Sequence, residues 1–305
     1  MATKEVVRPA ALAAPKSDTT RPPRAGGSRV GHLVRRTLYW LTTAAVIIAL
    51  LYPFVWLVTA SLKPRKDVFD NSLIPRPFQW SNYAEVWQQL PLMSWVLNSV
   101  VVGVAAALAV TVSSALVAFG FAYFQFPGRR SLFGLVLATM MLPAAVTLIP
   151  TYLIWNELGL ANTQVPLWAG NLFGSAFYIF LLRQFFRGLS REVLDAARVD
   201  GCGFFSLFWR IVVPMSKPAL AITFIFEFQA SWVDLLKPLV YLRDPQLYTL
   251  PRGLKAVLDQ FGQGGQREWE IVLAANVIAT VPMLLLFALC GRYIMQGITI
   301  TGNKE

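Results

Sequence analysis

Long apolar stretches alternate with short charged segments along this chain of 305 residues. Five stretches contain no Asp, Glu, Lys or Arg, namely 37–62, 86–128, 131–156, 158–182 and 271–291. A sixth, 218–233, is interrupted only by Glu227. A helix needs about 20 such residues to cross a hydrocarbon core of about 30 Å. The pattern therefore predicts six membrane-spanning helices, at about 37–60, 95–122, 131–154, 165–187, 217–237 and 270–292.

Prolines and glycines mark expected irregularities inside these spans. Pro53 is expected to kink the first span, and Pro143 and Pro150 to break the third, because proline lacks the amide hydrogen that a helix needs. The fourth span contains "GNLFG", with Gly170 and Gly174 at the spacing that lets two membrane helices approach closely. This spacing predicts close helix packing within the bundle.

Composition and charge agree with a membrane protein and predict its orientation. Charged residues make up 14% of the chain, whereas a soluble domain carries about a quarter. The net charge is +11, and most of the Lys and Arg residues lie in segments predicted to be on the same side of the membrane as the N-terminus. Such an excess marks the cytoplasmic face. Both termini are therefore predicted to be cytoplasmic. The positive charge is interpreted as a marker of the cytoplasmic face of the membrane and not as a nucleic-acid-binding surface, so no nucleic-acid partner is expected.

The chain is predicted to have two parts, and its residue inventory excludes several kinds of site. Residues 1–34 lack apolar periodicity and are expected to form a disordered basic arm, followed by a transmembrane domain at 35–305. His32 is the only histidine, and Cys202 and Cys290 have no paired spacing. This inventory excludes a His-dependent catalytic triad and a His/Cys metal cluster. No "GK" dipeptide occurs, so a phosphate-binding loop of the Walker A type is absent from the sequence.

A polar segment at 188–216 separates the fourth and fifth spans. Its first part, "EVLDAARVD", is a good helix former, and Gly201 and Gly203 then favour a turn. Apolar residues from Phe204 to Val212 recur at helical spacing, and Pro214 is expected to end that second helix. A helix resting on lipid headgroups has the same pattern. The small alanines beside an acidic, glycine-containing tip favour instead a protein partner with a cleft.

This segment resembles the EAA signature of permease subunits in binding-protein-dependent ABC importers. The signature has Glu-Ala-Ala, three residues, Gly, nine residues, Ile, any residue and Leu-Pro. The matching residues are Asp195, Ala196, Ala197, Gly201, Ile211 and Pro214. Asp195 replaces the usual Glu, Val213 the usual Leu, and Cys202 a common Ala. The segments "PRPFQWSNYAEVW" and "SWVDLLKPLVYLRDPQLYTLPRGL" are similar to the carbohydrate branch, the MalG-like permeases.

The resemblance implies an all-α polytopic membrane protein with the type I ABC importer permease fold and a cytoplasmic coupling helix. It implies location in the bacterial inner membrane as a multi-pass protein that is not itself an enzyme. The implied partners are a second permease subunit, with which the chain would form a heterodimer, two ATP-binding subunits, an extracellular or periplasmic solute-binding protein, and membrane lipid. This chain is expected to bind no cofactor, since ATP and Mg would lie on the partner ATPase.

The same resemblance assigns roles within the coupling loop. Glu192 begins the coupling helix. The docking tip would consist of Asp195, Ala196, Ala197, Asp200 and Gly201. The residues expected to brace it against the membrane helices are Phe204, Phe205, Leu207 and Phe208, with Ile211 and Pro214 completing the signature.

Glu227 is the principal acidic residue inside a predicted span. A carboxylate there costs several kcal/mol unless it faces a cavity or a partner. Glu227 therefore indicates either a residue of the substrate pathway or a buried polar contact between helices. The candidate pathway residues are Glu227, Gln229, Trp232, Asn98, Asn171 and Tyr178. The alternative function is a proton-driven secondary transporter for a small polar solute, which Glu227 would serve.

Overall fold

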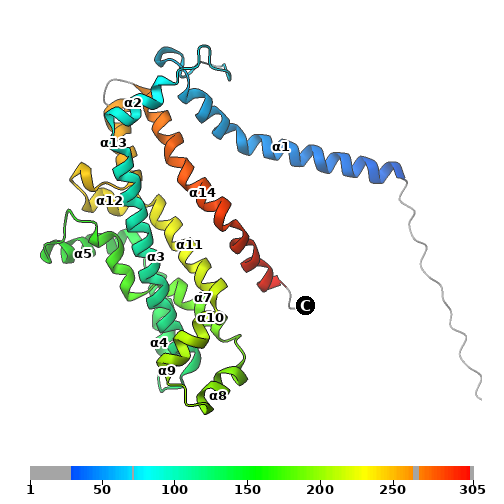
Figure 1. Cartoon of the computed structure of the whole chain (residues 1–305), viewed down its shortest axis with the longest axis vertical. Helices are drawn as coiled ribbons and strands as arrows, with labels where there is room; N and C mark the ends of the chain where they lie inside the picture. The colour runs from blue at the N-terminus through cyan, green and yellow to red at the C-terminus, as the bar shows by residue number, and fades with distance from the viewer. Residues whose placement is uncertain (1–28, 71, 264–267, 303–305) are drawn as a thin grey trace, which may run out of the picture. The chain divides into compact units, whose positions relative to one another are not determined.

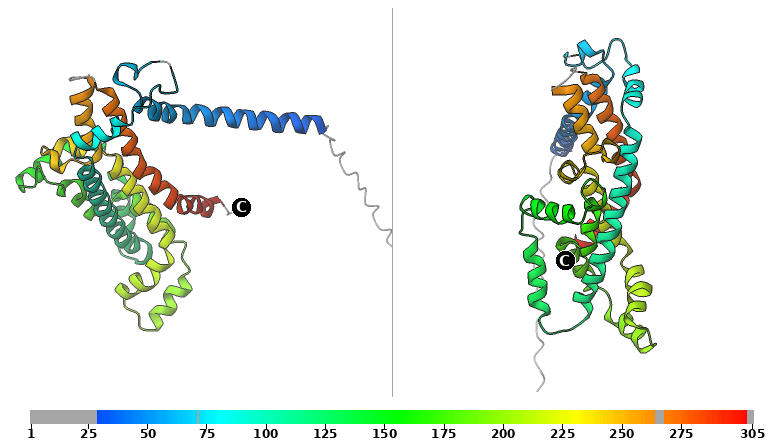
Figure 2. Two further views of the ribbon diagram at one scale, coloured as in Figure 1. Left: turned by 45° about the horizontal axis from the view of Figure 1, so that its top comes forward. Right: turned by 90° about the vertical axis from the view of Figure 1, so that its left-hand side faces the viewer.

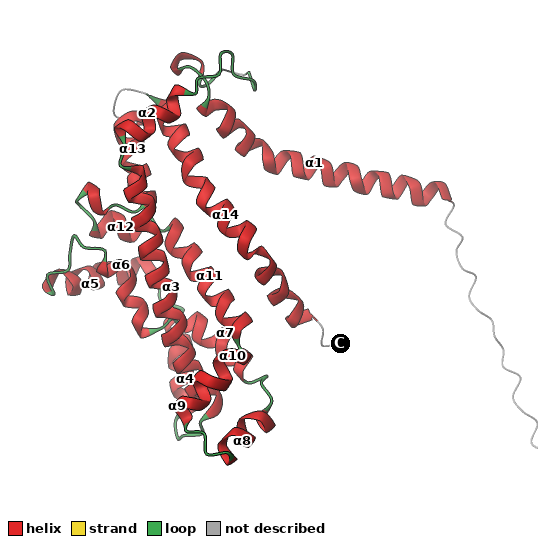
Figure 3. Cartoon of the chain, in the orientation of Figure 1, coloured by secondary structure: helices red, strands yellow, loops and turns green. Residues whose placement is uncertain are grey.

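The computed structural model describes residues 29–70, 72–263 and 268–302, and every regular element within these ranges is a helix, as Figure 3 shows. Contacts divide the chain into two compact units, Met1–Pro53 and Phe54–Glu305. The predicted arm at 1–34 lies mostly outside the described residues, and its last residues belong to a helix that begins at Arg29. The prediction of an all-α chain is therefore confirmed for the described residues.

Three helices are long and apolar enough to cross a membrane, and three bent pairs bring the number to six if each pair is one span. The long helices are α1 (Arg29–Ser61), α3 (Leu92–Tyr123) and α14 (Trp269–Gly302). In the first bent pair, α4 (Arg129–Thr139) is followed by α5 (Ala144–Glu157). In the second, α6 (Val165–Trp168) and η2 (Ala169–Phe173) are followed by α7 (Ala176–Phe186). In the third, α9 (Phe204–Leu207), η3 (Phe208–Val212) and α10 (Val213–Met215) are followed by α11 (Lys217–Val233). The shorter elements are η1 (Arg65–Asp67), α2 (Ser81–Gln89), α8 (Arg191–Val199), α12 (Leu236–Tyr241), η4 (Pro245–Leu247), α13 (Leu250–Val257) and η5 (Leu258–Gln263).

The third predicted span is not one helix. It bends by 94° between α4 and α5. Pro143 is the extended residue before α5, which leaves the α5 helix free to start in a new direction. Pro150 lies inside α5, and the helix continues through it, so the predicted break at Pro150 is wrong. In membrane helices, neighbouring groups can replace the hydrogen bond that a proline removes.

The fourth and fifth predicted spans also differ from the structure. The "GNLFG" segment forms the 3₁₀ turn η2 and ends at Gly174, whose φ of +79° suits glycine. A Cβ on Gly174 would lie 3.4 Å from the Ser114 hydroxyl of α3, whereas one on Gly170 would meet nothing within 4 Å. The predicted close packing within the bundle therefore occurs in this chain at Gly174 and not at Gly170. The fifth span ends at Val233, before its predicted end at 237, because Asp234 adopts an extended backbone conformation.

The second unit is built around α3, which packs against α7, η2 and α11, as Figures 1 and 2 show. Small residues allow the close approach: a Cβ on Gly103 of α3 would lie 3.0 Å from the Phe228 ring of α11. One apolar cluster surrounds Trp95, Phe228 and Ile271. A second, around Phe119 and Phe208, joins α3 and α7 to the segment that follows α8. This second cluster holds the predicted coupling loop against the bundle.

Candidate functional site

The helix α8 lies at one end of the second unit, and α2 and α13 lie at the other, as Figure 1 shows. Its sequence explains its bounds. Ser190 is extended before the first turn, Glu192 lies in that turn, and Arg198 lies in the last one. Acidic groups near the start and basic groups near the end stabilise a helix through its dipole. The predicted coupling helix is thus a short, separately capped element.

Gly201 ends α8 in a Schellman motif. The Cys202 amide donates to the Ala197 carbonyl at 3.0 Å, and the Gly201 amide donates to the Arg198 carbonyl at 3.1 Å. Gly201 has a φ of +84°, the left-handed conformation that this cap requires and that glycine adopts at least cost. A Cβ at Gly201 would meet nothing within 4 Å. The glycine of the signature is therefore required for its backbone conformation and not for space.

Only one face of α8 is covered by the rest of this chain. Leu194 is buried in the second apolar cluster, and Ala197 is half-buried. The predicted tip residues Asp195, Ala196 and Asp200 are exposed. Val199 is 87% exposed, an unusual position for a branched apolar side chain. The exposed face of α8 therefore combines carboxylates with small and apolar side chains, a surface suited to a protein partner.

The segment after α8 anchors it through some of the predicted bracing residues. Leu207 and Phe208 are buried against α3 and α7. Phe204 packs edge-on against Phe124, with ring centroids 4.8 Å apart, and the Arg198 guanidinium lies 3.8 Å above its ring. This stacking ties the last turn of α8 to the bundle.

One of the predicted bracing roles in this segment is wrong, and the predicted end of the second helix is close to the observed one. Phe205 is 73% exposed, so it does not brace the helix against this chain, because its position lies on the opposite side of the short helix from Leu207. Pro214 lies in α10, and the helix that runs on from Phe204 ends at Met215, so the predicted helix end at Pro214 is confirmed to within one residue. Ile211 is half-buried and adjoins the second apolar cluster, as the signature implies.

Sequence reasoning missed two exposed apolar residues on α8. Val193 and Val199 both lie off the face that Leu194 buries. The signal was present, because both positions are apolar yet out of phase with the buried Leu194 on a helical repeat. No sequence pattern indicates the stacking of Arg198 on Phe204, because this contact depends on the conformation of the turn between α8 and α9.

A second polar cluster lies between α3, η2, α7 and α11. The Asn171 Nδ2 group donates to Glu227 Oε1 at 2.5 Å and to the Ala106 carbonyl at 3.3 Å. Tyr178 lies within interaction range of the same carboxylate. Ser113 donates to the Asn171 carbonyl at 3.0 Å. The structure thus brings together three of the six predicted pathway residues, and Ser113 is an addition that its sequence context did not indicate.

The other three predicted pathway residues lie elsewhere. Asn98 donates to the carbonyls of Gln246 and Tyr248, at 2.8 and 3.0 Å, and so holds the loop before α13. Trp232 is buried in the first apolar cluster, stacked on Phe228. Gln229 is exposed, away from Glu227. Asn98 and Trp232 therefore have structural roles in this chain.

No group of three or more His, Cys, Asp or Glu side chains that could hold a metal occurs in the described part of the chain. The α8 surface can transmit force to the membrane helices through Leu194, Leu207 and Phe208. The Glu227 cluster can exchange hydrogen bonds with a polar solute.

Comparison with known proteins gives a consistent result. The family model "Binding-protein-dependent transport system inner membrane component" matches residues 111–300. The probable ABC transporter permease protein YurM of Bacillus subtilis (strain 168) is 33% identical over 270 residues, 87% of each chain. The arabinooligosaccharides transport system permease protein AraQ of the same organism is 30% identical, with 87% of this chain and 95% of that protein covered.

A further relative and a solved structure extend this result. The sn-glycerol-3-phosphate transport system permease protein UgpE of Yersinia pestis bv. Antiqua (strain Antiqua) is 33% identical, covering 83% of this chain and 92% of that protein. A crystal structure of a bacterial ABC transporter involved in the import of the acidic polysaccharide alginate matches with a TM-score of 0.78. It is 21% identical and covers 87% of this chain and 98% of that chain, which shows a shared fold.

Proposed function

Because this chain belongs to the family of binding-protein-dependent transport system inner membrane components, we propose that it forms half of the translocation pathway of an ATP-driven importer for a sugar or a sugar derivative. It is a multi-pass inner-membrane permease subunit. The names of its relatives support the substrate class, since they refer to arabinooligosaccharides and to sn-glycerol-3-phosphate. All of these solutes carry several hydroxyl or phosphate groups.

The exposed face of α8 is proposed to dock into a cytoplasmic ATPase subunit. The observation that carries this proposal is the 87% exposure of Val199 beside Asp195 and Asp200 on a helix whose other face is anchored by Leu194. An exposed apolar side chain on a fixed helix is typical of a protein interface. Closure of the ATPases would then move α8, and the second apolar cluster would transmit that motion to α3 and α7.

The remaining parts of the importer follow from the same family. A second permease would complete the pathway, two ATP-binding subunits would hold ATP and Mg, and a solute-binding protein would deliver the substrate outside. A bacterial alginate ABC transporter has been solved in complex with a periplasmic protein that binds an alginate pentasaccharide, which supports this arrangement. Both termini of this chain are proposed to be cytoplasmic. The Glu227–Asn171 contact supports a polar pathway between α3, α7 and α11.

The docking proposal is tested by Val199→Asp in the assembled importer. We expect the initial rate of sugar import to fall about tenfold, because a charge placed at an apolar contact in a protein interface weakens binding by roughly 1.4 kcal/mol. Val199 is exposed and packs on nothing essential, so the amount of chain in the membrane should stay unchanged. Uptake of radiolabelled sugar, with the permease quantified by immunoblot, measures both.

Ser190→Asp is the matched control, since it adds the same charge in the residue before the first turn of α8, where Asp is a good N-cap. It should import at the wild-type rate. If Val199→Asp also imports normally, the exposed face of α8 is not the docking surface. If import continues without ATP and instead stops when the proton gradient is dissipated, the importer assignment fails and the proton-driven alternative replaces it.

A further inference from the structure

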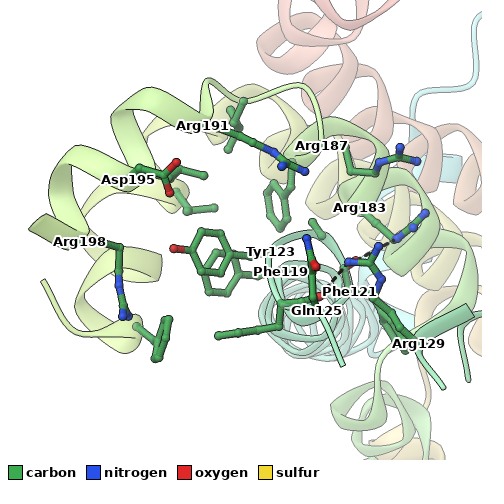
Figure 4. Close-up of a pocket in the computed structure, with 17 residues that line it drawn as sticks. Phe119, Phe121, Tyr123, Gln125, Arg129, Arg183, Arg187, Arg191, Asp195 and Arg198 are labelled. Atoms are coloured by element: carbon green, nitrogen blue, oxygen red, sulfur yellow. Dashed lines mark hydrogen bonds between the residues drawn. The ribbon is translucent and has the colours of Figure 1, made fainter. Parts of the chain in front are cut away.

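A cavity of about 530 Å³ lies behind α8, on the side that faces the bundle, as Figure 4 shows. Its walls come from the end of α3, the first turn of α4, the last turn of α7, and the helices α8 and α9. The proposed docking function gives no role to the cationic residues of this cavity, although Asp195 belongs both to the exposed face of α8 and to the cavity lining. Its lining combines aromatic rings with an unusual number of cationic side chains.

Five arginines line the cavity: Arg129, Arg183, Arg187, Arg191 and Arg198. Asp195 is the acidic residue in the lining. Among the described residues, the ion pairs closer than 4.0 Å involve other side chains, and none includes one of these five arginines. The cavity therefore concentrates positive charge that this chain does not neutralise by direct ion pairing.

Two of the guanidinium groups are held in place by the chain itself. Arg129 Nη1 donates to the Phe124 carbonyl at 2.8 Å, and Arg183 Nε donates to the Phe121 carbonyl at 3.3 Å. Arg183 also stacks over the Phe133 ring at 4.0 Å. Arg183 lies within electrostatic range of both Arg129 and Arg187. Two fixed like charges therefore lie near a third, that of the exposed Arg187, and each guanidinium has N–H groups that the described contacts do not use.

Arg129 and Arg183 are partly buried, and like charges there repel one another more strongly than in open water. A bound anion would remove this repulsion. Guanidinium groups bind phosphate through paired hydrogen bonds and are preferred for this purpose over ammonium groups. We infer that the cavity formed by Arg129, Arg183, Arg187 and Arg191 binds an anionic phosphate group.

The position of the cavity limits where this phosphate can come from. Arg129 is the first residue of α4, and Arg187 follows the last residue of α7, so both lie where predicted spans meet the cytoplasm. This is the depth of the headgroups of the inner leaflet, which hold anionic phosphates. The two sources are therefore the phosphate of an anionic phospholipid and a free phosphate from the cytoplasm. The aromatic wall formed by Phe119, Tyr123 and Phe186 is compatible with either one.

The experiment compares both sources on the purified full-length chain in detergent micelles. In the first arm, dioleoylphosphatidylglycerol is titrated, and retained lipid is counted by native mass spectrometry against dioleoylphosphatidylcholine. In the second arm, inorganic phosphate is titrated, and the thermal unfolding midpoint is followed. The variants are Arg187→Gln, whose exposed side chain makes no described hydrogen bond, and the double variant Arg183→Gln/Arg187→Gln. Arg130→Gln is the matched control, because it is exposed, adjacent to Arg129 and outside the cavity lining.

We expect the double variant to need about tenfold more anion for half-saturation, as the loss of charge-assisted hydrogen bonds predicts. The single variant should show a smaller shift in the same direction, and Arg130→Gln none. Retention of phosphatidylglycerol without a response to inorganic phosphate identifies the lipid as the source, and the reverse identifies free phosphate. The inference is overturned if the wild-type chain retains neither anion, or if Arg130→Gln weakens binding as much as the double variant. Both readouts are independent of transport, so they do not depend on the docking proposal.

Discussion

At the residue scale, the described glycine with the least room for a side chain is Gly253 of α13, which lies against Trp95 of α3. A Cβ on Gly253 would lie 2.2 Å from the indole ring. Trp95 is 3% exposed, and its Nε1 group donates to the Pro245 carbonyl at 3.0 Å, so the ring has little freedom to move. We expect Gly253→Ala to destabilise the chain by about 3 kcal/mol through overpacking. The thermal unfolding midpoint in detergent measures this effect.

Gly120→Ala is the matched control for this substitution. Gly120 also lies in a helix, α3, but a Cβ there would meet nothing within 4 Å. Alanine stabilises a helix interior relative to glycine by up to about 1 kcal/mol, so the midpoint should stay the same or rise. If Gly253→Ala unfolds at the wild-type temperature, α13 does not pack on α3 as described.

The sequence indicates which single residues are unusual for their surroundings, but it does not indicate which partners their side chains contact. Glu227 stood out because it is acidic within an apolar stretch, and the structure places it in a polar cluster. Asn98 and Asn171 looked equivalent in sequence, yet one holds a loop and the other bonds to Glu227. The difference arises because the partner of each amide comes from a distant part of the chain, which local sequence does not reveal.

At the element scale, the cap of α8 provides a prediction about the coupling loop. Gly201 has a φ of +84°, whereas Gly203 has a φ of −66°, and a Cβ at either position would meet nothing within 4 Å. Alanine at Gly201 must adopt a left-handed conformation that costs about 1–2 kcal/mol, and alanine at Gly203 pays no such cost. We expect Gly201→Ala to loosen α8 and Gly203→Ala to leave it unchanged. Hydrogen–deuterium exchange of the α8 amides measures the difference.

The Schellman bonds make this outcome specific. The amides of Gly201 and Cys202 should exchange faster in Gly201→Ala, because their bonds to the carbonyls of Arg198 and Ala197 depend on the left-handed residue. Equal exchange in the two variants would mean that the tertiary contacts of Leu194 alone hold α8. Amides in α3 serve as an internal reference and should be unaffected.

Apolar stretches in the sequence predict where the membrane helices lie. They do not predict the residues at which these helices bend. Pro143 and Pro150 appear equivalent in sequence, and only the first lies at a bend. Gly174 and Ser175 divide the fourth span, because the Ser175 amide finds an acceptor in the Ser114 hydroxyl of α3 at 3.1 Å. Such a replacement bond comes from another helix. Hydrophobic length therefore predicts that a span exists, whereas tertiary hydrogen bonds decide where it bends.

At the scale of the whole molecule, the arrangement of helices was implied by a resemblance and not by periodicity. Apolar runs predict which segments enter the membrane, and the distribution of Lys and Arg predicts orientation. Neither predicts that α3 packs against both α7 and α11, which depends on small residues such as Gly103. The match to a solved transporter with a TM-score of 0.78 confirms the fold class. The side of the membrane on which α8 lies remains a prediction from charge.

Orientation is tested by placing one cysteine at each end of the second unit. Val199→Cys and Ser72→Cys, each in a chain that also carries Cys202→Ser and Cys290→Ser, introduce single exposed thiols at α8 and after η1. We expect a membrane-impermeant maleimide to label Ser72→Cys in intact cells from which the outer membrane has been removed. Val199→Cys should be labelled only in inside-out vesicles, prepared from cells that lack the ATPase subunit so that the docking face is uncovered. The reason is that the arginines around α8 mark a cytoplasmic surface. Labelling of both thiols from the same side would contradict the predicted topology, and with it any contact between α8 and a cytoplasmic ATPase.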